Sequence, residues 1–311
     1  MVTTNKTDNK FKHKPNFFIV GAPKCGTTAL SVYLQTHPNI FITLPKEPHF
    51  FAEEFHIPKI TTWSEYLNLF EKVQPQHRVI GEASVHYLCS ELALSKIYQY
   101  NPNAKLVAMV RNPVDLVYSY HSQLLYNIGE ENEADFEKAW HLQTSRQQGQ
   151  NMPPLCCSPA TLQYKNIGAL GTQVEKMFSI FPREQIKVIL FDDFKTSTSS
   201  IYQEILTFLE VPNDGKTDFP QINKNRRHRI SLLGKLTEKP PEVLTATVKS
   251  FKQSLGIESL GIVRKIRKIN REEFERPPLD PKFRNYLVDE FKDEIVKLAN
   301  VLNTDLSHWL R

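Results

Sequence analysis

An anion-binding site is predicted at positions 21–28, where the chain reads Gly-Ala-Pro-Lys-Cys-Gly-Thr-Thr. The segment lies between a short apolar run at 17–20 and a helical pattern that follows it. A turn in that place directs several backbone N–H groups at one point, and the helix dipole adds partial positive charge. Gly21 and Gly26 tolerate backbone conformations that other residues resist, and Lys24 adds a full charge. These residues predict a cradle for a phosphate or sulfate group.

The segment is close to the nucleotide-binding pattern GxxxxGK[ST], but Thr27 stands where that pattern has its lysine. In nucleotide triphosphatases that lysine reaches the β- and γ-phosphates. Lys24 comes earlier in this chain, which argues against hydrolysis of ATP or GTP. A strand, turn and helix that bind no ligand are the alternative, although a buried Lys24 would then need another partner.

Three further blocks follow the loop. They read Lys-Glu-Pro-His-Phe-Phe at 46–51, Gly-Glu-Ala-Ser-Val-His-Tyr-Leu at 81–88, and Val-Arg-Asn-Pro at 110–113 with a serine at 119. In order and spacing, these blocks and the loop resemble the sulfotransferase family, in particular the heparan sulfate sulfotransferases and their bacterial relatives. One departure is Val85, because a proline is common there in that family.

The resemblance implies a reaction and a donor. Members of the family transfer a sulfuryl group from 3′-phosphoadenosine-5′-phosphosulfate (PAPS) to a hydroxyl or amine and release 3′,5′-ADP. Such a transfer needs positioning and charge stabilisation, and no metal is required in principle. The donor-binding residues that the resemblance implies are Pro23, Lys24, Cys25, Gly26, Thr27, Thr28, Ala29, Arg111, Ser119, Arg226 and Arg227. For the last two, the alternative is a solvated basic run.

The resemblance also implies the catalytic residues. Lys24 is expected to stabilise charge on the leaving oxygen, with a plain phosphate contact as the alternative. Glu47 is the expected base for the acceptor proton, and a surface salt bridge with Lys46 is its alternative. His49 lies two residues further on and is the second candidate for the base.

Three residues are expected on the substrate side. Lys46 is placed there as a possible contact of the sulfuryl group. Glu82 is expected to orient Lys24 or an acceptor hydroxyl, with a helix-start carboxylate as the equal alternative. His86 belongs to the same block as Glu82 and is assigned to the acceptor with it.

The elements that must position these residues follow from apolar runs and helix signals. Strands are expected at 17–20, 78–81, 105–110 and 186–191, and helices at 27–35, from 113 onward, at 200–209 and at 281–302. This alternation predicts an α/β fold: a P-loop-type three-layer sandwich with a mostly parallel central sheet flanked by helices. We expect a disordered leader at 1–15 and a single domain at 16–311.

Two stretches fit no core element and are expected on the surface around the site. The first, residues 143–160, is rich in Gln, Ser and Pro and is predicted to form a loop over the acceptor side. Its apolar members Met152, Leu155 and the two adjacent cysteines suit a pocket for a small organic acceptor. The second, residues 224–278, is strongly basic.

The composition is that of a packed globular protein of 311 residues, 40% hydrophobic and 23% charged. A net charge of +5 suits an anionic ligand without identifying one. Cys25, Cys89, Cys156 and Cys157 lack the spacing of a zinc site, and we expect thiols, with a bridge from Cys89 to the adjacent pair left open. The sequence contains no signal peptide and no apolar run of about 18 residues, so a cytoplasmic chain without a membrane span is expected.

Three other functions fit the sequence less well than sulfuryl transfer. A nucleotide-dependent kinase on the same fold is disfavoured by the early position of Lys24. A non-catalytic nucleotide-binding module is disfavoured by the presence of both Lys24 and Glu47. Nucleic-acid binding is the weakest option, because aromatic residues are sparse in the basic half. The acceptor is expected to be a carbohydrate or a small molecule, which the sequence does not distinguish.

Overall fold

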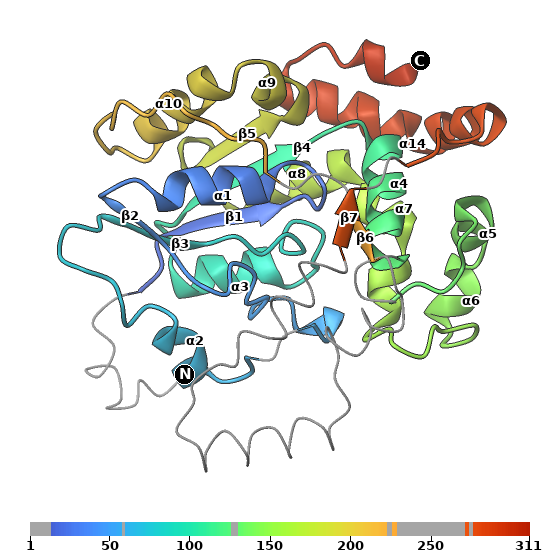
Figure 1. Cartoon of the computed structure of the whole chain (residues 1–311), viewed down its shortest axis with the longest axis horizontal. Helices are drawn as coiled ribbons and strands as arrows, with labels where there is room; N and C mark the ends of the chain where they lie inside the picture. The colour runs from blue at the N-terminus through green and yellow to red at the C-terminus, as the bar shows by residue number, and fades with distance from the viewer. Residues whose placement is uncertain (1–13, 58–59, 126–129, 223–225, 229–270, 274–275) are drawn as a thin grey trace.

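A five-stranded, all-parallel sheet forms the centre of the computed structural model, which describes residues 14–57, 60–125, 130–222, 226–228, 271–273 and 276–311 (Figure 1). Its strands lie in the order β2-β3-β1-β4-β5. They are β2 (Ile40–Ile42), β3 (Val79–Glu82), β1 (Phe17–Gly21), β4 (Lys105–Val110) and β5 (Ile186–Leu190). Because β1 is central, the loop that follows it opens at the middle of the carboxyl edge of the sheet.

Helices cover both faces of the sheet, as right-handed crossovers require. The connection from β1 to β2 through α1 (Thr27–Gln35) runs toward one edge, whereas that from β3 to β4 through α3 (Ala93–Tyr100) runs toward the other. Parallel strands joined by right-handed crossovers in opposite directions place their helices on opposite faces. α8 (Leu170–Ile180), which precedes β5, contacts α3 and therefore lies on its face.

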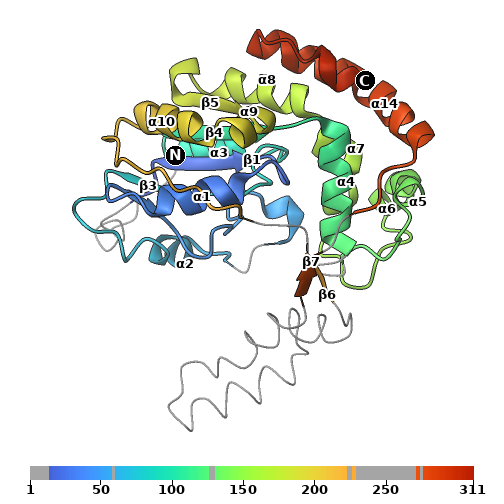
Figure 2. The same ribbon diagram turned by 45° about the horizontal axis from the view of Figure 1, so that its top comes forward.

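Two further groups of helices complete the layers. α9 (Phe191–Thr196) and α10 (Thr198–Phe208) follow β5 and lie beside α1, where the Tyr33 ring contacts Phe194. On the other side, α14 (Pro281–Leu302) packs against α8 and α4 (Pro113–Gln123), as Figure 2 shows. The remaining described elements are η1 (Glu53–Phe55), α2 (Trp63–Asn68), α5 (Phe136–His141), α6 (Gln143–Gln147), η3 (Pro159–Leu162), α7 (Tyr164–Gly168), η4 (Arg183–Gln185), η5 (Ser307–Leu310) and the antiparallel pair β6 (Arg226–His228) and β7 (Arg271–Glu273).

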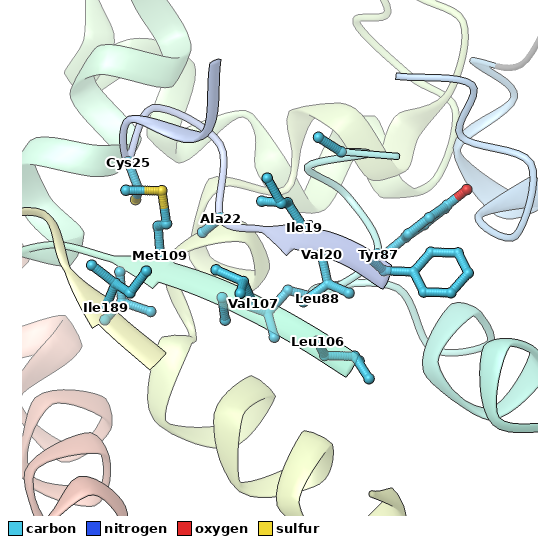
Figure 3. Packing of buried hydrophobic residues seen from close by; sticks show 14 of the residues in the cluster. Ile19, Val20, Ala22, Cys25, Tyr87, Leu88, Leu106, Val107, Met109 and Ile189 are labelled. Atoms are coloured by element: carbon cyan, nitrogen blue, oxygen red, sulfur yellow. The ribbon is translucent and has the colours of Figure 1, made fainter. Parts of the chain in front are cut away.

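The core lies between these layers and includes every residue of β1. Figure 3 shows Ile19 and Val20 of β1 beside Val107 and Met109 of β4, with Ile189 of β5 next to them. The first four of these side chains are 0% exposed. A parallel sheet covered on both faces needs strands that are apolar on both sides, which explains why β1 and β4 are continuous apolar runs.

Two glycines, Gly168 of α7 and Gly171 of α8, permit the close contact of these helices with α14. A Cβ atom built at Gly171 would lie 2.3 Å from the backbone oxygen of Glu294, and one at Gly168 would lie 2.5 Å from the Phe291 ring. Neither backbone position has room for a side chain, so the outer helix approaches the inner layer more closely than larger residues would allow.

The predicted fold class is confirmed, and most element boundaries agree. The helices at 27–35 and 281–302 and the strand at 105–110 have the expected bounds. Pro113 stands in the first turn of α4, where Asn112 caps the helix by accepting from the N–H of Val114. The strand expected at 186–191 ends one residue early, and the short strand β2 was not predicted.

The prediction that residues 143–160 form a loop is wrong at its start. α6 begins at Gln143, and within it Arg146 is fully buried in an ion pair with Glu131. Met152 and Cys156 pack against the core. Burial of one paired arginine and two apolar side chains explains why this polar segment is ordered next to the core.

Other expectations fall partly or wholly outside the described residues. Residues 1–13 of the predicted leader and most of the basic stretch 224–278 lie there. All four cysteines are thiols, so Cys89 forms no bridge to the adjacent pair. Among the described residues, no helix is long and apolar enough to cross a membrane.

Candidate active site

The anion-binding loop lies between a strand and a helix, as its sequence predicted. β1 ends at Gly21 and α1 begins at Thr27, with Gly26 as its left-handed N-cap at φ 90°. The loop precedes the N-terminus of α1, so it faces the positive end of the helix dipole, and no side chain caps the N–H groups there. A Cβ atom at Gly26 would lie 3.1 Å from the ring of Phe191, which favours glycine there a second time.

A cavity of about 530 Å³ opens over this loop. Its lining includes nine residues that the sequence assigned to the site: Pro23, Lys24, Gly26, Thr27, Thr28, Ala29, Glu47, Arg111 and Ser119. Eight further lining residues were not predicted: Val85, Asp115, Tyr118, Gln123, Phe191, Gln221, Ile222 and Arg276. The carboxyl edge of the sheet thus brings together blocks that are far apart in the chain.

Cys25 takes part in the loop without facing the cavity. Its side chain is 0% exposed and lies beside Met109 in Figure 3. Burial raises the pKa of its thiol to about 12, so the side chain is neutral. The thiol therefore acts as a core residue that supports the loop from below.

Arg111 connects the end of β4 to the loop. Its Nη1 donates to the backbone oxygen of Lys24 at 3.3 Å, and its guanidinium lies over the Phe191 ring, 4.9 Å from the centroid. Asp115, one turn further along α4, is 3.6 Å from Nη2. These contacts hold the guanidinium in place while it lines the cavity.

Arg276 is the most important cavity residue that sequence reasoning missed. Its Nη2 donates to Ser119 Oγ at 3.2 Å, and its guanidinium lies 5.0 Å from the centroid of the Tyr118 ring. The Tyr118 hydroxyl in turn donates to the Pro277 carbonyl oxygen at 2.8 Å. The available signal was an arginine directly before two prolines and a helix start. The sequence-based prediction instead assigned Arg226 and Arg227 to the donor, and their side chains lie outside the described residues.

Lys24 is held in a strongly cationic, partly enclosed site. Burial is the main reason that its pKa falls to about 8, and the charges of Arg276 and Arg111 lower it further. Its backbone is left-handed at φ 63°, an unusual conformation for a lysine. A cluster of cations that lower each other's proton affinity suits a polyanionic ligand, which would reverse the effect.

Lys46, Glu47 and His49 form a short chain of ionic contacts beside the loop. Lys46 Nζ lies 2.5 Å from Glu47 Oε1 and 3.3 Å from Thr28 Oγ1. Glu47 Oε2 lies 3.2 Å from His49 Nε2. Burial would raise the pKa of Glu47, but the Lys46 ammonium and the His49 ring outweigh it and hold that pKa far below its usual range.

Only Glu47 of the two candidate bases faces the cavity. His49 is 4% exposed and lies behind Glu47. The salt bridge with Lys46 that was the alternative for Glu47 is present, and it joins Glu47 to the anion loop rather than to the outer surface. The geometry therefore favours Glu47 over His49 as the group that meets an acceptor proton.

Glu82 and His86 do not reach the cavity, contrary to their assignment to the substrate. Glu82 is 0% exposed and is engaged by the hydroxyls of Tyr66, Tyr87 and Ser84. The His86 ring is buried, and its Nε2 lies 3.0 Å from Tyr120 Oη. Burial, with His49 next to it, lowers the pKa of His86 to about 3. Glu82 is the last residue of β3 and His86 follows it, but both side chains turn into the core.

Comparison with known proteins agrees with this geometry. Residues 14–273 match the family model for the sulfotransferase domain. The chain belongs to the sulfotransferase family. The matched residues include the sheet, the loop after β1 and every residue that lines the cavity except Arg276. Among the described residues there is no group of three or more His, Cys, Asp or Glu side chains that could hold a metal ion.

Similar proteins include both enzymes of carbohydrate sulfation and a bacterial protein. Carbohydrate sulfotransferase 15 of Homo sapiens is 24% identical over 63% of this chain and 44% of its own length. The bifunctional heparan sulfate N-deacetylase/N-sulfotransferase 3 of Mus musculus is 24% identical over 96% of this chain and 31% of its own. The chain thus spans less than half the length of these relatives.

The structure of a sulfotransferase from Alicyclobacillus acidocaldarius matches this chain over a larger share of its own length than the mammalian relatives do. It matches with a TM-score of 0.70 and 27% identity, and the match covers 96% of this chain and 100% of the bacterial one. The fold of this sulfotransferase domain therefore agrees with an experimental structure along nearly its whole length.

Proposed function

We propose that this sulfotransferase transfers the sulfuryl group of PAPS to a hydroxyl or amine of a carbohydrate or small-molecule acceptor and releases 3′,5′-ADP. The observation that carries the proposal is that Lys24 and Glu47 line one cavity between the anion loop and the Arg111 and Ser119 pair. A donor with a phosphosulfate on the 5′ and a phosphate on the 3′ position of its ribose needs two anion sites, and this cavity offers both.

The two anion sites suggest how the donor lies. The loop at 23–28 and the start of α1 suit the 5′-phosphosulfate, because backbone N–H groups and the helix dipole favour a compact anion. Arg111, Ser119 and Arg276 suit the 3′-phosphate, since two guanidiniums can bind one phosphate through several parallel hydrogen bonds. Phe191, Gln221 and Ile222 line the same cavity and offer an aromatic and an apolar surface to the adenine.

The reaction requires one cation and one base. As the acceptor oxygen or nitrogen attacks sulfur, Glu47 takes its proton. The bond between sulfur and the bridging oxygen breaks, and its electron pair remains on the phosphate, where the Lys24 ammonium stabilises the charge. The donor's negative charge raises the pKa of Lys24 above its value of about 8 in the free protein, so Lys24 is charged when it is needed.

The acceptor class rests on the relatives and on the cavity. The printed names of the mammalian relatives refer to carbohydrates and heparan sulfate, which supports a sugar hydroxyl or amine. Val85 and Gln123 line the cavity with Glu47, and an apolar and a polar side chain there also suit a small organic acceptor. A cytoplasmic location stays a prediction and would favour the small molecule.

Donor binding and transfer can be tested separately. 3′,5′-ADP should raise the melting temperature because it binds only the folded state, ATP should raise it little, and Arg111→Ala should remove most of the shift. Transfer from radiolabelled PAPS is then measured with N-desulfated heparin and with p-nitrophenol as acceptors, with and without EDTA. Equal stabilisation by ATP and 3′,5′-ADP, with no transfer of label from PAPS to either acceptor, would contradict the proposal and favour a kinase.

A further inference from the structure

Glu82 is a fully buried carboxylate with three hydrogen-bond donors, one from α2 and two from the residues that follow β3. Tyr66 of α2 donates to Oε1 at 2.7 Å, and Tyr87 donates to the same oxygen at 2.9 Å. Ser84 Oγ donates to Oε2 at 2.5 Å. All three donors suit an ionised carboxylate, which accepts without donating.

Ser84 passes this contact on to the segment that carries the base. Its Oγ also accepts from the backbone N–H of His49 at 2.9 Å. The backbone N–H of Ala83 donates to the carbonyl oxygen of Lys46 at 3.0 Å. Segment 46–49 is thus fastened at both ends to the residues that follow β3, and Glu47 stands between the two contacts.

The fastened end is a place where the backbone needs support. His49 has a left-handed conformation, φ 53°, which costs a non-glycine residue free energy unless the surroundings hold it. The Ser84 contact holds its N–H, and its ring contacts Glu47 Oε2. A change at Ser84 therefore reaches Glu47 by two routes, through the chain and through the ring of His49.

We propose that Glu82 is a positioning residue for Glu47, because through Ser84 it holds the backbone of His49 and so fixes segment 46–49 at the cavity. The inference rests on the proposed function for its meaning in catalysis, but the linkage itself is structural. This positioning role replaces the predicted contact of Glu82 with the acceptor, because the full burial of Glu82 excludes such a contact.

The proposal implies a dependence on the ionisation of Glu82. Burial raises its pKa to about 7, the three hydroxyls oppose that rise, and the nearby Glu47 carboxylate adds to it. Below that pH the protonated carboxyl must itself donate, and one of its three contacts changes. Turnover at saturating donor should therefore fall as the pH drops through about 7.

Two variants and one matched control test the proposal. Ser84→Ala breaks the link to His49, and Glu82→Gln keeps the shape but removes the ionisation. Tyr66→Phe also removes one hydroxyl from Glu82, but Tyr66 has no contact with segment 46–49 among the described hydrogen bonds. We expect Ser84→Ala and Glu82→Gln to lower kcat by roughly tenfold to a hundredfold with the Kd of 3′,5′-ADP unchanged. Tyr66→Phe should keep the plateau kcat and shift the acidic limb upward.

Coupling and the pH profile separate positioning from a merely structural role. The Ser84→Ala, Glu82→Gln double variant should be no slower than the slower single variant, because both changes break one link. The limb near pH 7 should be absent in Glu82→Gln. If Tyr66→Phe loses as much turnover as Ser84→Ala, or if the two losses multiply, Glu82 does not act through Ser84.

A readout without turnover keeps the two proposals distinguishable. The ring nitrogen resonances of His49 in isotope-labelled protein report its contact with Glu47, and they should move in Ser84→Ala and Glu82→Gln but not in Tyr66→Phe. If the wild type binds no 3′,5′-ADP and sulfates neither acceptor, the proposed function fails while this measurement still decides the linkage. Unchanged His49 resonances in Ser84→Ala would overturn the linkage even in an active enzyme.

Discussion

Glu47 Oε2 and His49 Nε2 lie 3.2 Å apart, and of the two side chains only that of Glu47 lines the cavity. The carboxylate is therefore placed between the anion loop, through Lys46, and a buried imidazole. This arrangement separates the two candidate bases by position, although they are only two residues apart in the chain.

Glu47→Gln should lower kcat by about a hundredfold or more while the Kd of 3′,5′-ADP persists, because the amide cannot take the acceptor proton. His49→Ala should cost less, since it removes a neighbour of the base and not the base. Steady-state turnover of PAPS and calorimetry with 3′,5′-ADP provide the two numbers. Near-normal turnover in Glu47→Gln with a collapse in His49→Ala would assign the base to His49.

Binding of 3′,5′-ADP should be accompanied by proton uptake at Lys24. The pKa of Lys24 is about 8 in the free protein, because of burial and the charges of Arg276 and Arg111, and an anion beside it raises that value. Between the two pKa values the complex binds more protons than the free protein, so uptake becomes large as the pH rises above about 8. Calorimetry in buffers of different ionisation enthalpy measures it. Lys24→Met should abolish the uptake; if uptake persists there, another group titrates.

Arg276→Ala should weaken 3′,5′-ADP binding by about tenfold to a hundredfold, the usual loss for one charge-assisted hydrogen bond. Arg276→Lys should recover part of it, since the charge returns without the planar fork. Arg284, which pairs with Asp115 at 2.9 Å and does not line the cavity, is the matched control. Equal losses in Arg284→Ala and Arg276→Ala would show that only the overall charge matters.

Arg146→Ala should destabilise the fold by about 3–5 kcal/mol, because it leaves Glu131 buried without its partner. Both side chains of this pair are 0% exposed and lie 2.6 Å apart. Lys165→Ala is the control, since the Lys165 and Glu290 pair is largely exposed and should contribute less than about 1 kcal/mol. Urea unfolding measures both. A small loss in Arg146→Ala would mean that water enters and solvates Glu131.

Local signals in the chain were sufficient for the fold and for most of the anion site. Continuous apolar runs predicted the inner strands β1 and β4, and Pro113 and Pro281 marked two helix starts. The loop after β1 could be predicted because its glycines, its lysine and its place before a helix all lie within one short segment. The resemblance to the sulfotransferase family predicted two further cavity residues, Glu47 in the block at 46–51 and Arg111 in the block at 110–113.

The direction of side chains and the contacts between distant segments were decided only by the tertiary structure. Glu82 lies within a predicted block, yet it turns into the core, where two tyrosines and Ser84 supply its hydrogen-bond donors. Arg276 donates to Ser119, which lies more than half of the chain away in sequence. Arg146 is buried although its segment is polar, because it forms an ion pair with the buried Glu131. Such pairings depend on which donors and charges become neighbours after folding, and the local sequence around each residue does not determine this.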